Sequence, residues 1–354
     1  MRTPRQGDGH ALRKNWPACL VACCLILAAA LTASVKDTWP HGQGAPAVEG
    51  RWAILVTGLS GDADLQKQYL KELVDLRGLL EGALAFPRDH VYALSDAEKV
   101  DSPRIQYQST RENLLKVCKE ITGRAGKGDL VFIFLEGHGN FDEDKYKLNL
   151  VGPDPTGEEL AEMFYSIPAE RFAVINATSC SGGSLEALSG RGRIVVSATK
   201  SGNERNLTHF GRYFIEAFVN NNADVDKNGR ISIFEAFTYA ARKVEEYYTK
   251  SGSLPTEHPV LSDNGGANAL TLAEAGDQIA LLSRAAYLDS GSPLYAQAGS
   301  DPETRALVKE AQALEKQIEL LKTAKGEMKQ EEYDKQLEGL LIKLAEVQAK
   351  LRKK

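Results

Sequence analysis

The sequence lacks the features of several large classes of protein. No apolar run reaches the roughly 18 residues from which a membrane-spanning helix is recognised, so a polytopic membrane protein is excluded. Its 354 residues carry a formal net charge of −5 and no cluster of lysine and arginine, which argues against a dedicated nucleic-acid binder. With 43% apolar and 26% charged residues, the composition is that of a globular chain able to bury a sizeable core.

Cysteine is scarce as well. Three of the five cysteines, Cys19, Cys23 and Cys24, lie in one short N-terminal stretch, and only Cys118 and Cys180 lie beyond it. Two cysteines cannot form the disulfide framework of a small secreted domain, so such a framework is excluded. Cys118 falls on the apolar face of an expected helix, which predicts that it packs in the core.

The N-terminal 34 residues are typical of a secretory signal. Residues 1–17 carry a net charge of +3, and residues 18–33 are 16 apolar or small residues. This order predicts export to a periplasmic or extracellular location. The alternative is an uncleaved membrane anchor, since the apolar run is just under the spanning length. Cleavage would remove the +3 segment and change the net charge from −5 to −8, and the Gly/Pro-rich residues 35–50 predict a linker.

Short apolar runs alternate with helical patterns from residue 51 to residue 273. The runs are apolar throughout, which is typical of strands in a parallel sheet that is covered by helices on both faces. We therefore expect an α/β domain over 51–273 with a mostly parallel central sheet. The expected strands are 52–58, 90–96, 129–137, 171–179 and 193–199, and the expected helices are 63–84, 110–125 and 158–167.

The end of the chain follows a different pattern. In residues 303–354 apolar residues recur at alternating spacings of four and three, and the segment TAKGEMKQEE interrupts them. The pattern predicts two amphipathic helices, which form either a helical hairpin or a coiled-coil seam with another chain. Self-association or partner binding through 303–354 therefore stays open. Residues 274–302 are expected to be a loosely structured connection.

Two glycine-rich segments follow the third and fourth expected strands. They are EGHGN, residues 136–140, and ATSCSGG, residues 177–183. In an open parallel sheet, ligands bind beyond the carboxyl ends of the strands, and adjacent strands lie about 4.8 Å apart. If the two strands are neighbours, His138 and Cys180 lie within reach of each other, as a cysteine–histidine nucleophilic pair requires. The glycines beside His138 allow a sharp turn and a close approach of the backbone to a ligand.

Further local signals bear on this pair. A short helix is expected near Ser184, and its dipole together with a protonated His138 would favour the thiolate of Cys180. The alternative for a lone cysteine or histidine is structural packing. His258 is a rival base, whose alternative is an ordinary loop histidine. There is no Gly-x-Ser-x-Gly elbow, zinc-ligand spacing, P-loop or GxGxxG motif, so no organic cofactor is expected.

The two strand endings are similar to those of a known peptidase family. His138 in FIFLEGHGN and, 42 positions later, Cys180 in VINATSCSGGS resemble the caspase–haemoglobinase fold of cysteine peptidases. The resemblance is greatest to the legumain branch, which includes the GPI transamidase subunit, and it covers about residues 51–270. It implies a three-layer sandwich, Cys180 as nucleophile, His138 as general acid and base, and the amides of Gly139 and Cys180 as the oxyanion hole. Its substrates would be proteins or peptides.

The chain departs from the legumain pattern at two positions. Plant and animal legumains carry an acidic residue two before the nucleophile, where Thr178 stands here, and Gln66 stands near the place of a basic residue. The resemblance implies attack on a peptide bond, while these departures leave the preferred residue before the cleaved bond open. Three functions stay open: hydrolysis by an endopeptidase, transpeptidation in which an amine replaces water, and a non-catalytic calcium-binding scaffold.

A segment of twelve residues, 224–235, matches the EF-hand calcium loop at every key position. Gly229 permits the sharp turn, Ile231 would pack inward, and amphipathic patterns flank the segment. We expect a structural calcium ion, while the alternative is a calcium-free turn capped by Glu235. The expected oxygen ligands are Asp224, Asp226, Asn228, the Arg230 carbonyl, Ser232 and bidentate Glu235.

Overall fold

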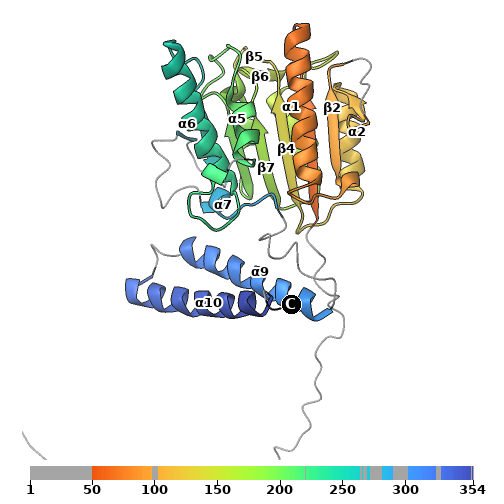
Figure 1. Cartoon of the computed structure of the whole chain (residues 1–354). Helices are drawn as coiled ribbons and strands as arrows, with labels where there is room; N and C mark the ends of the chain where they lie inside the picture. The colour runs from red at the N-terminus through yellow and green to blue at the C-terminus, as the bar shows by residue number, and fades with distance from the viewer. Residues whose placement is uncertain are drawn as a thin grey trace, which may run out of the picture. The chain divides into compact units, whose positions relative to one another are not determined.

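The computed structural model describes most of the chain beyond the N-terminal region (Figure 1). The expected export signal and linker, and most of the expected connection, lie outside the described residues. Within the described ranges, no helix has both the length and the apolar character needed to cross a membrane. The described residues are 50–97, 103–219, 221–263, 265, 269–271, 281–289, 302–323, 328–351 and 353.

An eight-stranded sheet forms the centre of the fold (Figure 1). Its strands are β1 Arg51–Thr57, β2 Val91–Ser95, β3 Tyr107–Gln108, β4 Leu130–Glu136, β7 Arg171–Asn176, β8 Arg193–Ser197, β9 Val260–Asp263 and β10 Leu270–Thr271. Their order is β10-β9-β8-β7-β4-β1-β2-β3. Every neighbouring pair from β8 to β3 is parallel, and β9 and β10 are paired antiparallel. The expected α/β fold with a mostly parallel sheet is confirmed.

Apolar clusters lie on both faces of the sheet. In β4, Phe132 and Phe134 belong to one cluster, and Val131, Ile133 and Leu135 belong to the other. This alternation is the period of two of a pleated strand, and it explains why the strands are apolar throughout. The first cluster includes side chains of α1 Ala63–Glu81, α5 Phe210–Ala217 and α6 Ile233–Ser251, and the second those of α2 Arg111–Thr122 and α3 Gly157–Tyr165.

Capping residues set the ends of two of these helices. In α3, Thr156 and Glu159 form a capping box, and in α6 Ser232 and Glu235 form another. Each box satisfies main-chain N–H groups that have no partner inside the helix. α6 ends at Gly252, whose φ of 66° is the left-handed conformation in which helices commonly terminate.

Several short elements are not predicted by hydrophobic periodicity. Directly after His138, β5 Gly139–Asp142 and β6 Lys145–Leu148 form an antiparallel hairpin of largely polar residues. The short helix expected near Ser184 is confirmed as α4 Leu185–Leu188, and a 3-10 turn, η2 Ser181–Ser184, precedes it. The remaining short elements are η1 Arg88–His90, η3 Asn221–Ala223 and α7 Leu281–Arg284.

Two long helices, α9 Pro302–Thr323 and α10 Gln330–Leu351, occupy the C-terminal segment. A small apolar cluster of their own joins them, with Ala311 and Leu314 from α9 and Val347 from α10 buried in it. The two helices therefore pack against each other along their apolar stripes, as the four-and-three spacing predicts. Association of this segment with another chain stays a prediction.

Candidate active site and calcium loop

The strands that carry His138 and Cys180 are direct neighbours. β4 and β7 run parallel, with Leu135 opposite Asn176 near their carboxyl ends. His138 follows the last residue of β4 by two positions, and Cys180 follows the last residue of β7 by four. Both residues therefore leave the same edge of the sheet, at the ends of adjacent strands, where ligands bind in folds of this kind.

The glycines that flank the histidine have no room for a side chain. Gly137 has a φ of +121°, and a Cβ there would lie 3.0 Å from the main-chain nitrogen of Gly58. A Cβ at Gly139 would lie 2.5 Å from the carbonyl oxygen of Ser179 and 2.5 Å from a ring carbon of Tyr146. Only glycine lets the end of β4 approach the loop after β1 and the turn after β7 this closely.

Cys180 occupies a constrained turn. Its φ of 59° and ψ of 6° lie in the left-handed region. This conformation costs a residue with a side chain roughly 1–2 kcal/mol, and such strain is concentrated at functional sites. The residue is 1% exposed. The turn therefore holds the thiol in a fixed place, and in this structure it is shielded from solvent.

Buried hydroxyl groups hold this turn on its β8 side. Ser181 Oγ accepts a hydrogen bond from Ser197 Oγ at 2.9 Å and lies 3.2 Å from Thr199 Oγ1. Thr199 Oγ1 accepts the N–H of Gly182 at 2.8 Å. Because an unpaired buried polar group is costly, this set of satisfied bonds fixes the turn relative to the end of β8.

Thr178, two residues before Cys180, belongs to a second buried network. Its hydroxyl lies 2.7 Å from the hydroxyl of Tyr146 and donates to Asn176 Oδ1 at 2.8 Å. Asn176 Nδ2 donates in turn to Ser184 Oγ at 3.0 Å. Thr178 is fully buried, so in this arrangement it supports the turn and does not face a substrate.

The two amides expected to form an oxyanion hole both have acceptors within the protein. The N–H of Gly139 donates to Ser179 Oγ at 3.1 Å, and the Ser179 hydroxyl donates back to the Gly139 carbonyl at 3.0 Å. The N–H of Cys180 donates to the carbonyl oxygen of Glu204 at 2.8 Å. These amides can bind an oxyanion only after both bonds are exchanged. No spacing in the sequence indicates Ser179 or Glu204, because both contacts join segments from different loops.

Burial dominates the electrostatics of the thiols. It raises the pKa of the Cys180 thiol, while the charge of Arg205 and a hydrogen bond with Ser179 act in the opposite direction. The expected support from a helix dipole is small, because η2 and α4 are only four residues long each. Cys118 is fully buried in the core as predicted, and burial raises its pKa to about 12.

The two candidate bases differ in their surroundings. His138 is half-buried, and its Nε2 faces the loop after β1, where a Cβ at Gly61 would lie 3.9 Å away. The ring of His258 is already paired, with Nδ1 2.5 Å from Glu204 Oε1. The main-chain N–H of His258 also donates to Glu204 Oε2 at 3.1 Å. This pairing favours the interpretation of His258 as a loop histidine held by a carboxylate.

A buried carboxyl group lies at the end of β4. Glu136 is 5% exposed, and its Oε2 has no hydrogen-bond partner among the described residues. Burial, followed by the charge of Glu72 and a hydrogen bond with it, raises the pKa of Glu136 well above its usual value. Nothing in the sequence indicates this pair, which joins β4 to α1.

The predicted calcium loop has the internal hydrogen bonds of a compact turn. Asp224 accepts the N–H of Asn228 at 3.1 Å on one oxygen and the N–H of Gly229 at 2.9 Å on the other. The N–H of Arg230 donates to Asn228 Oδ1 at 2.8 Å. Gly229 has a φ of +80°, which the turn requires. Four of the twelve positions are thereby held in one tight loop between α5 and α6.

Three acidic groups of the loop converge. Asp224, Asp226 and Glu235 each offer a carboxylate oxygen, and these oxygens all lie within 4.8 Å of one another. One oxygen of Glu235 accepts the N–H of Val225 at 2.9 Å, and the other accepts the N–H of Ser232 at 2.9 Å. Hard oxygen donors in this arrangement suit calcium. Glu235 also makes the capping box of α6, as the calcium-free alternative predicted.

A segment after α7, which no sequence pattern indicates, lies against the loop. Ser232 forms a β-bridge with Tyr287, and the N–H of Ile233 donates to the carbonyl of Ala286 at 2.9 Å. Arg230 NH2 lies 2.7 Å from Asp289 Oδ1. Residues 286–289 therefore lie against the loop.

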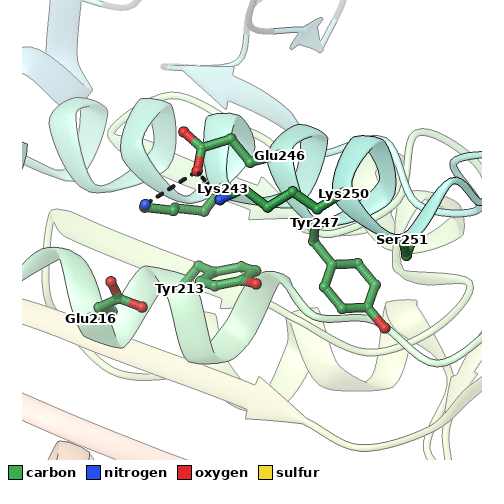
Figure 2. Close-up of a pocket in the computed structure, with 7 residues that line it drawn as sticks. All are labelled: Tyr213, Glu216, Lys243, Glu246, Tyr247, Lys250 and Ser251. Carbon is green, nitrogen blue, oxygen red and sulfur yellow. Dashed lines mark hydrogen bonds and ion pairs between the residues drawn. The ribbon is translucent and has the colours of Figure 1, made fainter.

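A surface cavity of about 390 Å³ lies away from both sites. Figure 2 shows Tyr213 and Glu216 of α5 facing residues of α6 across it. Glu246 accepts from Lys243 at 3.3 Å and from Lys250 at 3.4 Å, so the charged groups of the cavity pair with one another. None of the predicted site residues lines it, and we assign no role to it.

Comparison with known proteins does not identify the chain. No family model matches it, and no curated protein matches it. Among solved structures, one match is the crystal structure of protein GSU0716 from Geobacter sulfurreducens, with 14% sequence identity and a TM-score of 0.41. The match covers 60% of this chain and 92% of that chain.

Proposed function

We propose that this chain is an exported cysteine endopeptidase of the legumain-like, three-layer caspase–haemoglobinase type, with Cys180 as nucleophile and His138 as general acid and base. The observation that carries the proposal is the placement of both residues at the carboxyl ends of adjacent parallel strands. The left-handed turn at Cys180 supports it, because a strained strand-to-helix turn is how other hydrolases present a nucleophile.

The proposed reaction has two steps. In the first, Cys180 loses its proton to His138, and the thiolate attacks the peptide carbonyl carbon. The carbon–nitrogen bond breaks as His138 protonates the leaving amine, which leaves a thioester on Cys180. In the second, His138 takes a proton from water, the hydroxide attacks the thioester, and the thiol is regenerated with the release of a carboxylate.

The oxyanion of each tetrahedral intermediate would be held by the amides of Gly139 and Cys180. Such donors contribute roughly 3 kcal/mol each to the stability of a transition state in comparable enzymes. In the structure these amides donate to Ser179 Oγ and to the Glu204 carbonyl. The proposal therefore requires that an oxyanion replaces both acceptors when a substrate binds.

The decisive experiment is cleavage of a peptide library by the full-length protein and by Cys180→Ala. We expect cleavage by the wild type and none by Cys180→Ala, because the thioester cannot form without the thiol. Cys118→Ala is the matched control, since Cys118 is a core thiol on α2 and its loss should leave cleavage intact. Cleavage that survives in Cys180→Ala would refute the mechanism.

One observation favours a second candidate function, the non-catalytic calcium-binding scaffold. The thiol of Cys180 is 1% exposed and the amides beside it are occupied, which a scaffold would also tolerate. Absence of cleavage in the peptide library, combined with a calcium response of the loop at 224–235, would favour the scaffold. Products joined to an added amine would instead indicate transpeptidation.

We propose further that the 224–235 loop binds a structural calcium ion, with no organic cofactor. Asp224, Asp226, Asn228, the Arg230 carbonyl, Ser232 and Glu235 would supply its oxygen ligands. The convergence of three carboxylates supports this assignment. The ion would stabilise the junction between α5 and α6 and take no part in the reaction at Cys180.

A further inference from the structure

In the structure, Cys180 is shielded from solvent and its main-chain N–H is already bonded. An active nucleophile needs an accessible thiol and a free main-chain amide beside it. Here the residue is 1% exposed, and its N–H donates to the Glu204 carbonyl at 2.8 Å. Glu204 belongs to the segment after β8, residues 200–205, which we call the latch segment. This segment makes the bond that a substrate oxyanion would have to replace.

The latch segment is attached to the β5–β6 hairpin on one side. A Cβ at Gly202 would lie 2.2 Å from the ring of Phe141, and one at Gly183 would lie 2.5 Å from the same ring. The Phe141 ring therefore rests directly on both glycine backbones. Arg205 NH2 donates to the carbonyl of Phe141 at 2.6 Å. The hairpin, the latch segment and the turn of Cys180 are therefore packed against one another.

On the other side the latch segment is held by a single side-chain pair. Glu204 Oε1 lies 2.5 Å from His258 Nδ1, and Glu204 Oε2 accepts the N–H groups of His258 at 3.1 Å and of Lys200 at 3.0 Å. The Glu204 side chain is 13% exposed and that of His258 is 42% exposed. One carboxylate therefore ties the segment that covers Cys180 to the loop before β9.

We propose that residues 200–205 are an autoinhibitory latch over Cys180, held closed by the Glu204–His258 pair, and that substrate engages only the form in which the latch has moved. The proposal rests on the proposed peptidase function for its biological meaning. Its physical content, that the latch limits access to the thiol and to the Cys180 amide, does not depend on catalysis.

The latch segment is held by few hydrogen bonds, so it can open without unfolding of the domain. A hydrogen bond within a protein contributes a net factor of about ten or less to an equilibrium constant, because water replaces it on opening. A segment held by a few such bonds opens often enough for its open form to be a minor population, from which a ligand can select. Removing the His258 ring should therefore raise the open population severalfold without exposing the core.

The test measures access to the thiol directly. Full-length protein is treated with iodoacetamide at neutral pH, and labelling of each cysteine is followed by peptide mass spectrometry. We expect Cys180 of the wild type to react at least ten times more slowly than N-acetylcysteine. His258→Ala should accelerate labelling of Cys180 at least fivefold, and Glu204→Gln, which weakens the same pair, should do likewise. Faster hydrogen exchange of the Cys180 amide is expected in parallel.

Controls separate the latch from general loosening. Cys118, which is fully buried, should stay unlabelled in every folded variant, so labelling there identifies a variant that has lost its fold. Arg111→Ala breaks the ion pair between α2 and α3, in which Arg111 NH2 lies 2.6 Å from Glu159 Oε1. This variant should leave the rate of Cys180 labelling at its wild-type value. The two latch variants test the same pair, so one that unfolds leaves the other decisive.

The outcomes for latch and peptidase are distinct. The latch proposal is wrong if wild-type Cys180 reacts with iodoacetamide as fast as N-acetylcysteine does. It is also wrong if the folded latch variants label at the wild-type rate. Both outcomes count whether or not peptides are cleaved. Accelerated labelling of Cys180 without any peptide cleavage supports the latch proposal and contradicts the proposed peptidase function. Accelerated labelling together with faster peptide cleavage supports both.

Discussion

The two ends of the sheet are built in different ways. His138 and Cys180, which are 42 positions apart in sequence, follow the carboxyl ends of the adjacent strands β4 and β7. At the other end, where Arg51 begins β1 and donates to the carbonyl of Leu288 at 2.8 Å, the calcium loop is one contiguous segment. In Figure 1 the β5–β6 hairpin and α7 mark these opposite ends.

The difference lies in what holds each site. The calcium loop is shaped mainly by hydrogen bonds among its own twelve residues, such as those that Asp224 accepts from Asn228 and Gly229. The turn at Cys180 is shaped by residues from other loops, among them Gly139 and Glu204. A contiguous loop can change its ligand state locally, whereas the assembled site depends on contacts with other segments and changes when one of them moves.

The largest effect is expected from Gly139→Ala, at the assembled end. The added Cβ would lie 2.5 Å from the Ser179 carbonyl, so backbone must shift. We expect a loss of about 3 kcal/mol in the free energy of unfolding, measured by urea denaturation, together with loss of peptide cleavage. Gly339→Ala in α10 is the matched control: no atom lies within 4 Å there, and a stability gain of up to about 1 kcal/mol is expected. Wild-type stability in Gly139→Ala would contradict the close approach.

The features that can be predicted from the sequence differ between the fold and the contacts of the site. Apolar runs predict the strands, and the rule that parallel strands end at a common edge predicts that His138 and Cys180 lie there. Periodicity does not predict β5 and β6, because these strands are short and their residues are largely polar and turn-forming. Nor does it predict the bonds of Ser179 and Glu204, which depend on how separate loops meet. The placement of His138 and Cys180 at one edge of the sheet is thus accessible from the sequence, while the contacts of the turn at Cys180 are not.

The second prediction concerns calcium at the contiguous end. An ion that binds only the folded state at a hundred times its Kd stabilises the protein by about 2.7 kcal/mol, so calcium should raise the Tm of the wild type measurably. Glu235→Ala should abolish this rise. Glu159→Ala is the matched control, because Glu159 fills the same capping-box position in α3 and its loss should lower the Tm while leaving the calcium response intact. If calcium leaves the Tm of the wild type unchanged, the assignment of a calcium site to residues 224–235 is wrong.

A smaller effect is expected from the acid pair at the end of β4. The pKa of Glu136 is raised above its ordinary value of 4.5, so the folded state holds the proton more tightly than the unfolded state. Stability from this group is therefore present at low pH and falls as pH rises above 4.5 through the folded pKa. Glu136→Gln should be more stable than the wild type at pH 8, by on the order of 1 kcal/mol, and this advantage should shrink toward pH 4.

The measurement is urea denaturation of both proteins across that pH range. Glu112→Gln, at an exposed position of α2, serves as the control and should follow the wild type at every pH. An advantage of Glu136→Gln that is independent of pH would show that packing against α1, and not the raised pKa of Glu136, decides its stability. Calcium should not alter the result, since the pair lies at the opposite end of the sheet.

The smallest effect is expected at the segment that covers the calcium loop. Asn228 Nδ2 donates to the hydroxyl of Tyr287 at 3.1 Å, and Arg230 stacks on the Tyr287 ring with its guanidinium carbon 3.8 Å from the ring centre. Tyr287→Phe removes the hydroxyl and keeps the stacking, so it should cost about 0.5–1 kcal/mol. Because Tyr287 is not a calcium ligand, the rise in Tm with calcium should persist at its wild-type size. Loss of the calcium response in Tyr287→Phe would mean that the loop is not self-contained, and both ends of the sheet would then depend on contacts between distant segments.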